Sequence, residues 1–201
     1  MNGKPEGVAE VKTMRDLERQ WRPKREAVYG ELPFVAATPE KVLDAIAQTA
    51  FTSLAVYGNC CRSVLWAIQI HLRREDASIL RASSVLAGGV CGTGKTCGTV
   101  IGGLMAIGEA LGSADFRDLG RYETANASAS SFVEHMRDLY GSTDCYDIQR
   151  AVMGWCCDDP DKQEEWTNAG GPTACAGVSA RAARLAAGII LDRRAESDEV
   201  P

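Results

Sequence analysis

Long apolar runs are missing from this sequence, and none reaches the roughly 20 residues that a membrane-spanning helix needs. The N-terminal segment MNGKPEGVAEVKTMRDLERQW also lacks the apolar stretch of a secretory signal. A surplus of basic residues is missing too, because the net charge is −5 and the pI is about 5.2. Nucleic-acid binders usually need a basic face to neutralise phosphates. These absences predict a cytoplasmic protein with no nucleic-acid partner and no insertion into a membrane.

Strand patterns are equally scarce, since no alternating run rich in β-branched residues occurs anywhere in the chain. Apolar residues instead recur at helical spacing. We therefore predict an all-α fold, a compact bundle of five to seven helices. Residues 1–37 are expected to form a charged N-terminal arm that packs on the domain or on a partner subunit. Residues 38–193 should form the helical domain and residues 194–201 a flexible tail.

Capping residues and apolar spacing together set the expected helix boundaries. Residues 113–127 should be a polar connection, and residues 155–172 a loop or insertion rich in acidic side chains. The predicted helices span residues 39–57, 60–73, 76–86, 97–111, 128–140, 145–154 and 172–193.

Eight cysteines are more than a protein in a reducing compartment keeps by chance, which points to metal or redox use. Four of them lie at predicted helix starts, where backbone N–H groups are unpaired and the helix dipole is positive. Such positions favour thiolate by lowering the thiol pKa. They would also favour a bound anion, such as an iron–sulfur cluster held by thiolates. The four are Cys60, Cys97, Cys145 and Cys175, and we predict that they converge on one site.

The spacing of these four cysteines differs from that of zinc fingers and ferredoxins, which use short CxxC-type pairs. The fold must therefore assemble the site from distant segments. The helix predicted to start at Cys97 also carries Gly98, Gly102, Gly103 and Gly108. Since glycine weakens a helix by about 1 kcal/mol relative to alanine, these residues suggest close approach by another backbone, by a bulky group or by a crossing helix.

Four segments in order, YGNCCRSVLWAI, AGGVCGTGKTCGTVIGGLMAIG, FVEHMRDLYGSTDCYDIQ and TACAGVSARAARLAAGII, resemble the family of redox-active proteins named for its C-GCAxxG-C-C cysteine pattern. The resemblance covers roughly residues 40–192. Cys97, Gly98 and Gly102 match the family's CGAxxG motif, in which Thr99 replaces an alanine. The family's other cysteines fall on Cys60, Cys145 and Cys175.

The resemblance implies a helical protein with a redox or metal site. Our leading interpretation is an iron–sulfur protein in electron transfer, in which these four cysteines hold the cluster and a redox partner protein supplies or accepts electrons. The alternative is a metal-free thiol–disulfide protein that uses the same cysteines. A homo-oligomer is possible in either case. The chain has no CxxCH motif for haem attachment.

A third hypothesis, from a different class, rests on GVCGTGKT at residues 89–96, which fits the phosphate-binding GxxxxGK[ST] pattern. Lys95 would then reach phosphates and Thr96 would hold Mg²⁺. That chemistry requires a strand before the loop, and the preceding ILRASSVLA is a poor strand. Among the remaining cysteines, Cys91 could be an auxiliary ligand or a resolving thiol, and the vicinal pair Cys156 and Cys157 lies in the expected loop.

Overall fold

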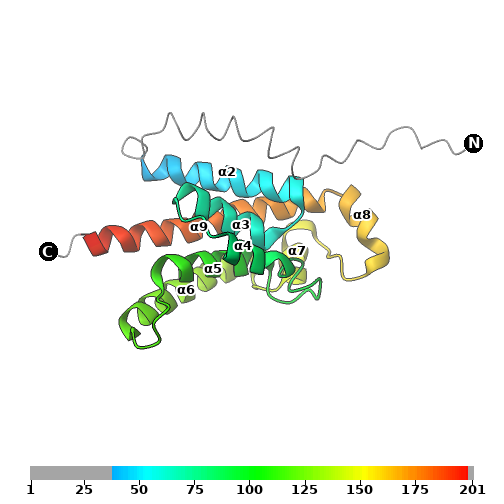
Figure 1. Ribbon diagram of the computed structural model, residues 1–201. Coiled ribbons are helices and arrows are strands. Elements are labelled where there is room, and N and C mark those ends of the chain that lie inside the picture. The colour runs from blue at the N-terminus through cyan, green and yellow to red at the C-terminus, as the bar shows by residue number, and fades with distance from the viewer. Residues whose placement is uncertain (1–37, 199–201) are drawn as a thin grey trace, which may run out of the picture. The chain divides into compact units, whose positions relative to one another are not determined.

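The computed structural model describes residues 38–198, so the expected arm at residues 1–37 lies outside the described residues. The described part is all-α and contains no strand, only an isolated bridge between Thr96 and Asp144 (Figure 1). Its elements are α2 (Pro39–Tyr57), α3 (Cys60–His71), α4 (Ala77–Ala82), the 3₁₀ turn η1 (Ser83–Val85), α5 (Gly98–Leu111), α6 (Leu119–Tyr140), α7 (Cys145–Met153), the 3₁₀ turn η2 (Pro160–Lys162), α8 (Gln163–Asn168) and α9 (Gly171–Asp198).

The eight α-helices within residues 38–198 exceed the predicted five to seven. Helix α6 begins at Leu119, well inside the expected polar connection, because Asp118 caps it by accepting from the backbone N–H of Arg121. Its first turns are polar and exposed, so they carry no apolar periodicity. Likewise η2 and α8 lie within the expected loop, where Trp166 is buried.

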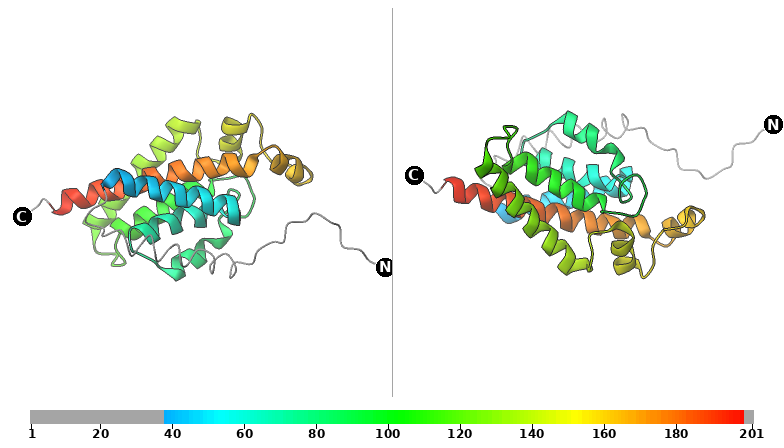
Figure 2. Two further views of the ribbon diagram at one scale, coloured as in Figure 1. Left: turned by 90° about the horizontal axis from the view of Figure 1, so that it is seen from above. Right: turned by 90° about the horizontal axis from the view of Figure 1, so that it is seen from below.

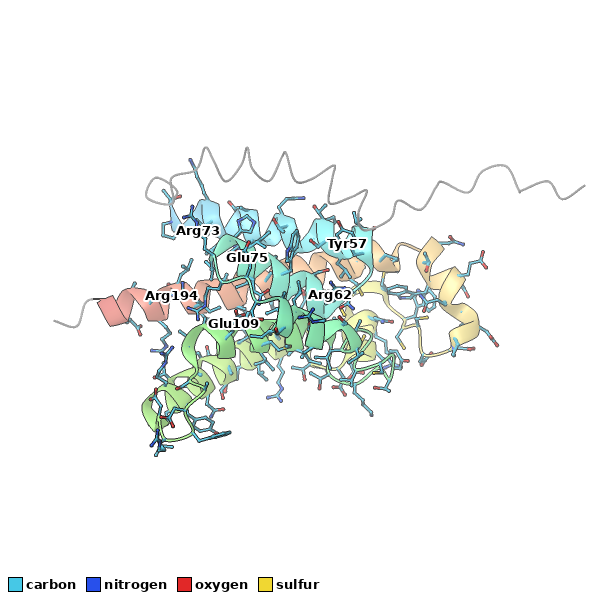
Figure 3. The ribbon with its side chains drawn as sticks, in the orientation of Figure 1. Tyr57, Arg62, Arg73, Glu75, Glu109 and Arg194 are labelled. Carbon is cyan, nitrogen blue, oxygen red and sulfur yellow. The ribbon has the colours of Figure 1, made fainter. Side chains whose placement is uncertain are left out.

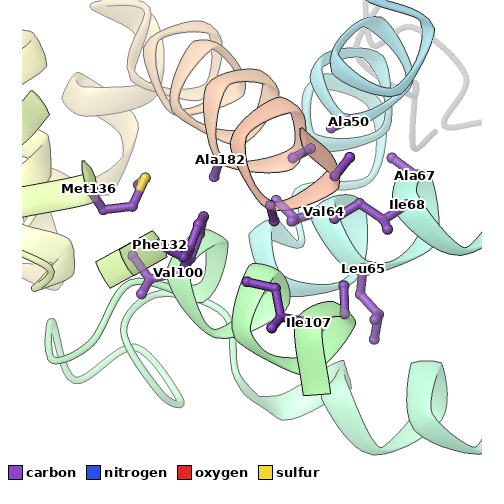
Figure 4. Packing of buried hydrophobic residues seen from close by; sticks show 14 of the residues in the cluster. Ala50, Val64, Leu65, Ala67, Ile68, Val100, Ile107, Phe132, Met136 and Ala182 are labelled. Atoms are coloured by element: carbon purple, nitrogen blue, oxygen red, sulfur yellow. The ribbon is translucent and has the colours of Figure 1, made fainter. Parts of the chain in front are cut away.

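Helices α2 and α9 lie side by side and run in opposite directions, as Figures 1 and 2 show. Helix α5 contacts α3, α6 and α9, so it lies at the centre of the packing. The core between these helices is apolar, with Leu65, Ile107 and Phe132 fully buried (Figure 4). Four alanines on α9 are also buried and let its neighbours approach closely: Ala182, Ala183, Ala186 and Ala187.

Helix α9 is long and apolar enough to cross a membrane by length and composition alone. In this fold 44% of its apolar window is buried inside the protein. The helix continues to Asp198 rather than ending near Arg193 as predicted.

The two ends of the bundle carry different residues. Figure 3 shows Tyr57 and Arg62 at the end where α3 begins, whereas Arg73, Glu75 and Arg194 lie toward the other end. At that other end Glu109 accepts a hydrogen bond from Gln69 at 3.0 Å. The cysteines at helix starts belong to the first of these ends.

Candidate functional site

The glycine-rich loop before α5 folds back on itself. Its backbone φ is positive at five successive residues, from Gly88 to Gly92, and the value of 62° at Val90 is unusual for a β-branched side chain. Every backbone N–H from Cys91 to Lys95 donates to a carbonyl oxygen within residues 85–90. The loop is therefore held by hydrogen bonds within its own backbone, which fix the position of residue 96 at its end.

Backbone hydrogen bonds join the end of this loop to the start of α7. The Cys97 N–H donates to Thr143 O at 2.8 Å, and the Cys145 N–H donates to Lys95 O at 2.7 Å. The ring of Tyr146 also lies directly over Gly94, where a side chain would overlap it. These contacts place Cys97 beside Cys145 even though the two are far apart in the sequence.

The glycines of the CGAxxG-like motif bring the start of α3 to the same place. A methyl group at Gly98 would overlap the Cys60 sulfur and would lie 3.0 Å from Leu86 O. A methyl group at Gly102 would lie 2.5 Å from Cys61 O. The prediction that glycines on this helix permit close approach by a backbone or a bulky group is thus confirmed at these two positions. At Gly108 nothing lies within 4 Å of the added methyl, so that glycine has no such role.

Three of the four predicted site cysteines lie close enough together for their thiols to interact. Cys97 is the shared member, because its thiol interacts with those of both Cys60 and Cys145. Cys175 lies within electrostatic range of Cys60 and Cys97. Cys97 and Cys145 are only 6% and 5% exposed, so solvent reaches this group mainly at the half-buried Cys60 and Cys175.

The starting turns of the helices place these cysteines much as the sequence predicts. Cys60 and Cys145 are the first residues of α3 and α7, and Cys97 is the N-cap of α5. Asn59 caps α3 by accepting from the Arg62 N–H at 3.1 Å. Cys175 differs from the expectation, because α9 begins at Gly171 and the cysteine lies beyond its first turn.

The expected lowering of the thiol pKa is wrong for three of the four. The interaction with the Cys97 thiol and burial raise the pKa of Cys60, and the interaction with the Cys145 thiol together with burial raises the pKa of Cys97. Burial raises the pKa of Cys175 from 9.0 to about 12, which corresponds to about 4 kcal/mol. A helix terminus would contribute only about 0.3–1 kcal/mol even to a thiol in its first turn, and Cys175 lies beyond that turn. Desolvation and mutual repulsion therefore outweigh the helix dipole at this site.

Several polar groups nonetheless surround the sulfurs. Backbone N–H groups of Gly88 and Cys61 oppose the rise of the Cys60 pKa, which means that they donate toward its sulfur. The Thr99 hydroxyl lies 3.2 Å from the Cys97 sulfur. The buried amide of Gln149 donates to the Cys145 sulfur at 3.5 Å. Sequence reasoning missed this glutamine, although its place one turn after Cys145 could have indicated it.

The other four cysteines occupy different surroundings. Cys61 is fully buried and its thiol points to the Met105 sulfur at 4.0 Å. Cys91 is exposed, and its thiol donates to a carbonyl of its own loop. Cys156 is buried, whereas Cys157 is half-buried and donates to the Gln163 side chain at 3.2 Å. None of the four is hydrogen-bonded to another thiol among the described contacts.

The donor set suits some metal centres better than others. Within residues 38–198 no group of three or more His, Cys, Asp or Glu side chains surrounds a single point where one metal ion could be held. A mononuclear zinc or iron site is therefore not preformed. Four buried or half-buried thiols from four helices are the ligand type of iron–sulfur clusters, in which the cysteines are distributed over several iron atoms. The residues present thus fit a cluster in their chemistry.

The loop at residues 89–96 does not have the structure of a phosphate-binding loop. The segment before it is the 3₁₀ turn η1, and no strand precedes it in the described chain. Phosphate-binding loops present free backbone N–H groups to the ligand. Here the N–H groups from Cys91 to Lys95 are already donated to carbonyl oxygens.

The fold and the gathered thiols define an all-α protein with a cysteine-rich centre. Comparison with known families gives the same class. Residues 58–189 match the family described as "Putative redox-active protein (C_GCAxxG_C_C)", and the chain belongs to this family. No curated protein and no solved structure matches the chain.

Proposed function

We propose that this protein carries an iron–sulfur cluster on Cys60, Cys97, Cys145 and Cys175 and passes electrons to and from a redox partner protein. The observation that carries the proposal is the proximity of Cys97 to both Cys60 and Cys145, whose thiols lie close enough to shift its pKa. The interaction with Cys97 and burial raise the pKa of Cys60, burial raises the pKa of Cys175, and repulsion between neighbouring thiolates adds to both shifts. Iron supplies positive charge that removes this repulsion.

The protein's own groups would support such a cluster without contributing ligands. Hydrogen bonds to sulfur and limited access of solvent are the means by which proteins set cluster potentials. Backbone N–H groups face Cys60, a hydroxyl lies beside Cys97 and an amide donates to Cys145. Burial of Cys97 and Cys145 would exclude water and oxygen, while the half-buried Cys60 and Cys175 lie closer to a partner.

A panel of cysteine variants tests the proposal. Purified without oxygen, the parent chain should contain iron and acid-labile sulfide and absorb in the visible range. Serine at any of the four proposed ligands should remove most of this signal. Alanine at Cys61 is the matched control, because this thiol is adjacent to Cys60 but points to Met105. Loss of iron in the Cys61 variant, or its retention in all four ligand variants, would place the centre elsewhere.

The proximity of the Cys97 thiol to those of Cys60 and Cys145 favours a second candidate function, a metal-free dithiol–disulfide centre. Oxidation of Cys97 with Cys60 or with Cys145 would form one S–S bond and release two protons and two electrons to an oxidant such as a low-molecular-weight disulfide. Mass spectrometry after iodoacetamide trapping distinguishes the two candidates. A parent chain that holds no iron after reconstitution but loses two free thiols at these positions on oxidation would support the second candidate over the first.

A further inference from the structure

The side chain of Gln149 links the site to a neighbouring loop. Gln149 lies one turn after Cys145 on α7, on the same face of the helix, and is only 7% exposed. Its Nε2 donates to the Cys145 sulfur at 3.5 Å. Its Oε1 accepts from the backbone N–H of Cys157 at 2.8 Å. One buried amide thus connects a site sulfur to the segment that carries the vicinal cysteines.

The orientation of this amide follows from the chemistry of its partners. A backbone N–H can only donate, so the group facing Cys157 must be the oxygen. The NH₂ group is then left to face the Cys145 sulfur, which can accept. A reversed amide would set two donors against each other and lose both bonds. Gln149 is therefore a donor to the site and an acceptor from the loop at the same time.

We infer that Gln149 is a positioning residue that donates to the Cys145 sulfur and thereby couples the state of Cys145 to the accessibility of Cys157. The redox part of this inference rests on the proposed function, whereas the coupling itself does not. The loop is held elsewhere by the buried side chain of Cys156 and by an ion pair that is weaker. The ion pair between Arg150 and Asp158, at 3.2 Å, lies at the surface with both side chains about half exposed, and such pairs contribute little.

The coupling has a simple physical basis. If the Cys145 sulfur is removed or ceases to accept a hydrogen bond, the Nε2 of Gln149 becomes an unpaired donor in a buried place. An unpaired buried donor is unfavourable, so the side chain should turn toward solvent. The Cys157 N–H then loses its acceptor as well, and the loop opens more often.

Two substitutions separate the two ends of Gln149. Gln149→Glu keeps an acceptor for the Cys157 N–H but, once ionised, offers no donor to the Cys145 sulfur. Gln149→Leu has nearly the same size and loses both bonds. Gln48→Leu is the matched control, because Gln48 is an exposed residue of α2 that bonds only to Thr52 in its own helix.

Two measurements read the two ends. The alkylation rate of Cys157, mapped by mass spectrometry on the reduced, metal-free chain, reports on the loop. It should rise roughly two- to tenfold in Gln149→Leu and in Cys145→Ala, as expected for the loss of one hydrogen bond, and stay near the parent value in Gln149→Glu. The midpoint potential of the loaded centre should shift to a more negative value in both Gln149 variants, because a donor that stabilises negative charge on sulfur is lost.

Other results would overturn the inference. An unchanged Cys157 rate in both Gln149→Leu and Cys145→Ala would show that no coupling exists. An unchanged midpoint potential in Gln149→Glu would show that the amide does not act on the centre. If the parent binds no iron, the proposed cluster fails, but the alkylation rates still decide the coupling because they are measured without metal.

Discussion

Replacing Gly98 by alanine should damage the site, whereas the same change at Gly108 should stabilise the protein. Both glycines lie on α5. The methyl group of Gly98→Ala would overlap the Cys60 sulfur and lie 3.1 Å from the backbone nitrogen of Cys61. A side chain alone could move away, but this backbone belongs to the first turn of α3. The start of α3 must therefore shift away from α5.

The magnitudes follow from general values. Overpacking of this kind costs about 1–3 kcal/mol, and the better helix propensity of alanine recovers at most about 1 kcal/mol. Gly98→Ala should therefore lower the free energy of unfolding by up to about 3 kcal/mol. Gly108→Ala meets nothing within 4 Å and should raise that free energy by up to about 1 kcal/mol. The two variants form a matched pair with the same substitution in the same helix.

Urea unfolding of the reduced, metal-free chain measures the change in stability. The iron bound after anaerobic reconstitution measures the damage to the site. Gly98→Ala should lose iron binding even under conditions where it is fully folded, because Cys60 is displaced from Cys97. Gly108→Ala should bind iron like the parent. If Gly98→Ala proves as stable as Gly108→Ala and binds iron equally well, the close approach of α3 to α5 is not what assembles the site.

Three further predictions concern charge. Burial raises the pKa of Glu109, so its ionisation opposes folding. The free energy of unfolding should therefore fall as the pH rises above the ordinary pKa of 4.5. In urea unfolding, Glu109→Gln should flatten the stability curve from pH 4.5 to 7. The pKa values of Cys61 and Cys175 are raised to about 12, so ionisation of these thiols opposes folding. The free energy of unfolding of the metal-free chain should therefore hold below about pH 9 and fall above it, by about 1.4 kcal/mol per pH unit for each thiol. A flat stability curve from pH 8 to 10 would contradict this. Calorimetric titration with ATP and Mg²⁺ should show no tight binding that Lys95→Ala removes, since the loop N–H groups are already bonded.

The sequence predicts those elements best whose boundaries are written in local chemistry. Helix α2 spans Pro39–Tyr57 as expected, because Pro39 suits the first helical position and Gly58, with φ of 68°, ends the helix. Helix α8 could not be predicted in this way. Its buried Trp166 packs against Gly171, a tertiary contact that no local pattern records.

In the candidate site, too, the features set by local chemistry could be predicted and the tertiary contacts could not. Helix starts that contain cysteine can be read from capping residues, so Cys60 and Cys145 were placed correctly at the first positions of their helices. The contact between Cys97 and Cys145 depends on backbone hydrogen bonds between two distant loops, which leave no signal in a single sequence. The Thr99 hydroxyl beside the Cys97 sulfur is also a product of the fold.

The raised thiol pKa values explain why the gathering of these cysteines points to redox chemistry rather than to a stable store of thiolates. Burial raises the pKa of Cys175, and the neighbouring thiols of Cys97 and Cys60 raise it further. Such a site can keep its protons, exchange them for an S–S bond or exchange them for metal cations. Metal binding releases the protons to solvent, so it should become more favourable as the pH rises. In exchange with a low-molecular-weight disulfide the protons pass to the thiols of the reduced oxidant. The packing of α3 against α5, made possible by Gly98, therefore holds Cys60 close to Cys97, and the proposed function depends on this arrangement.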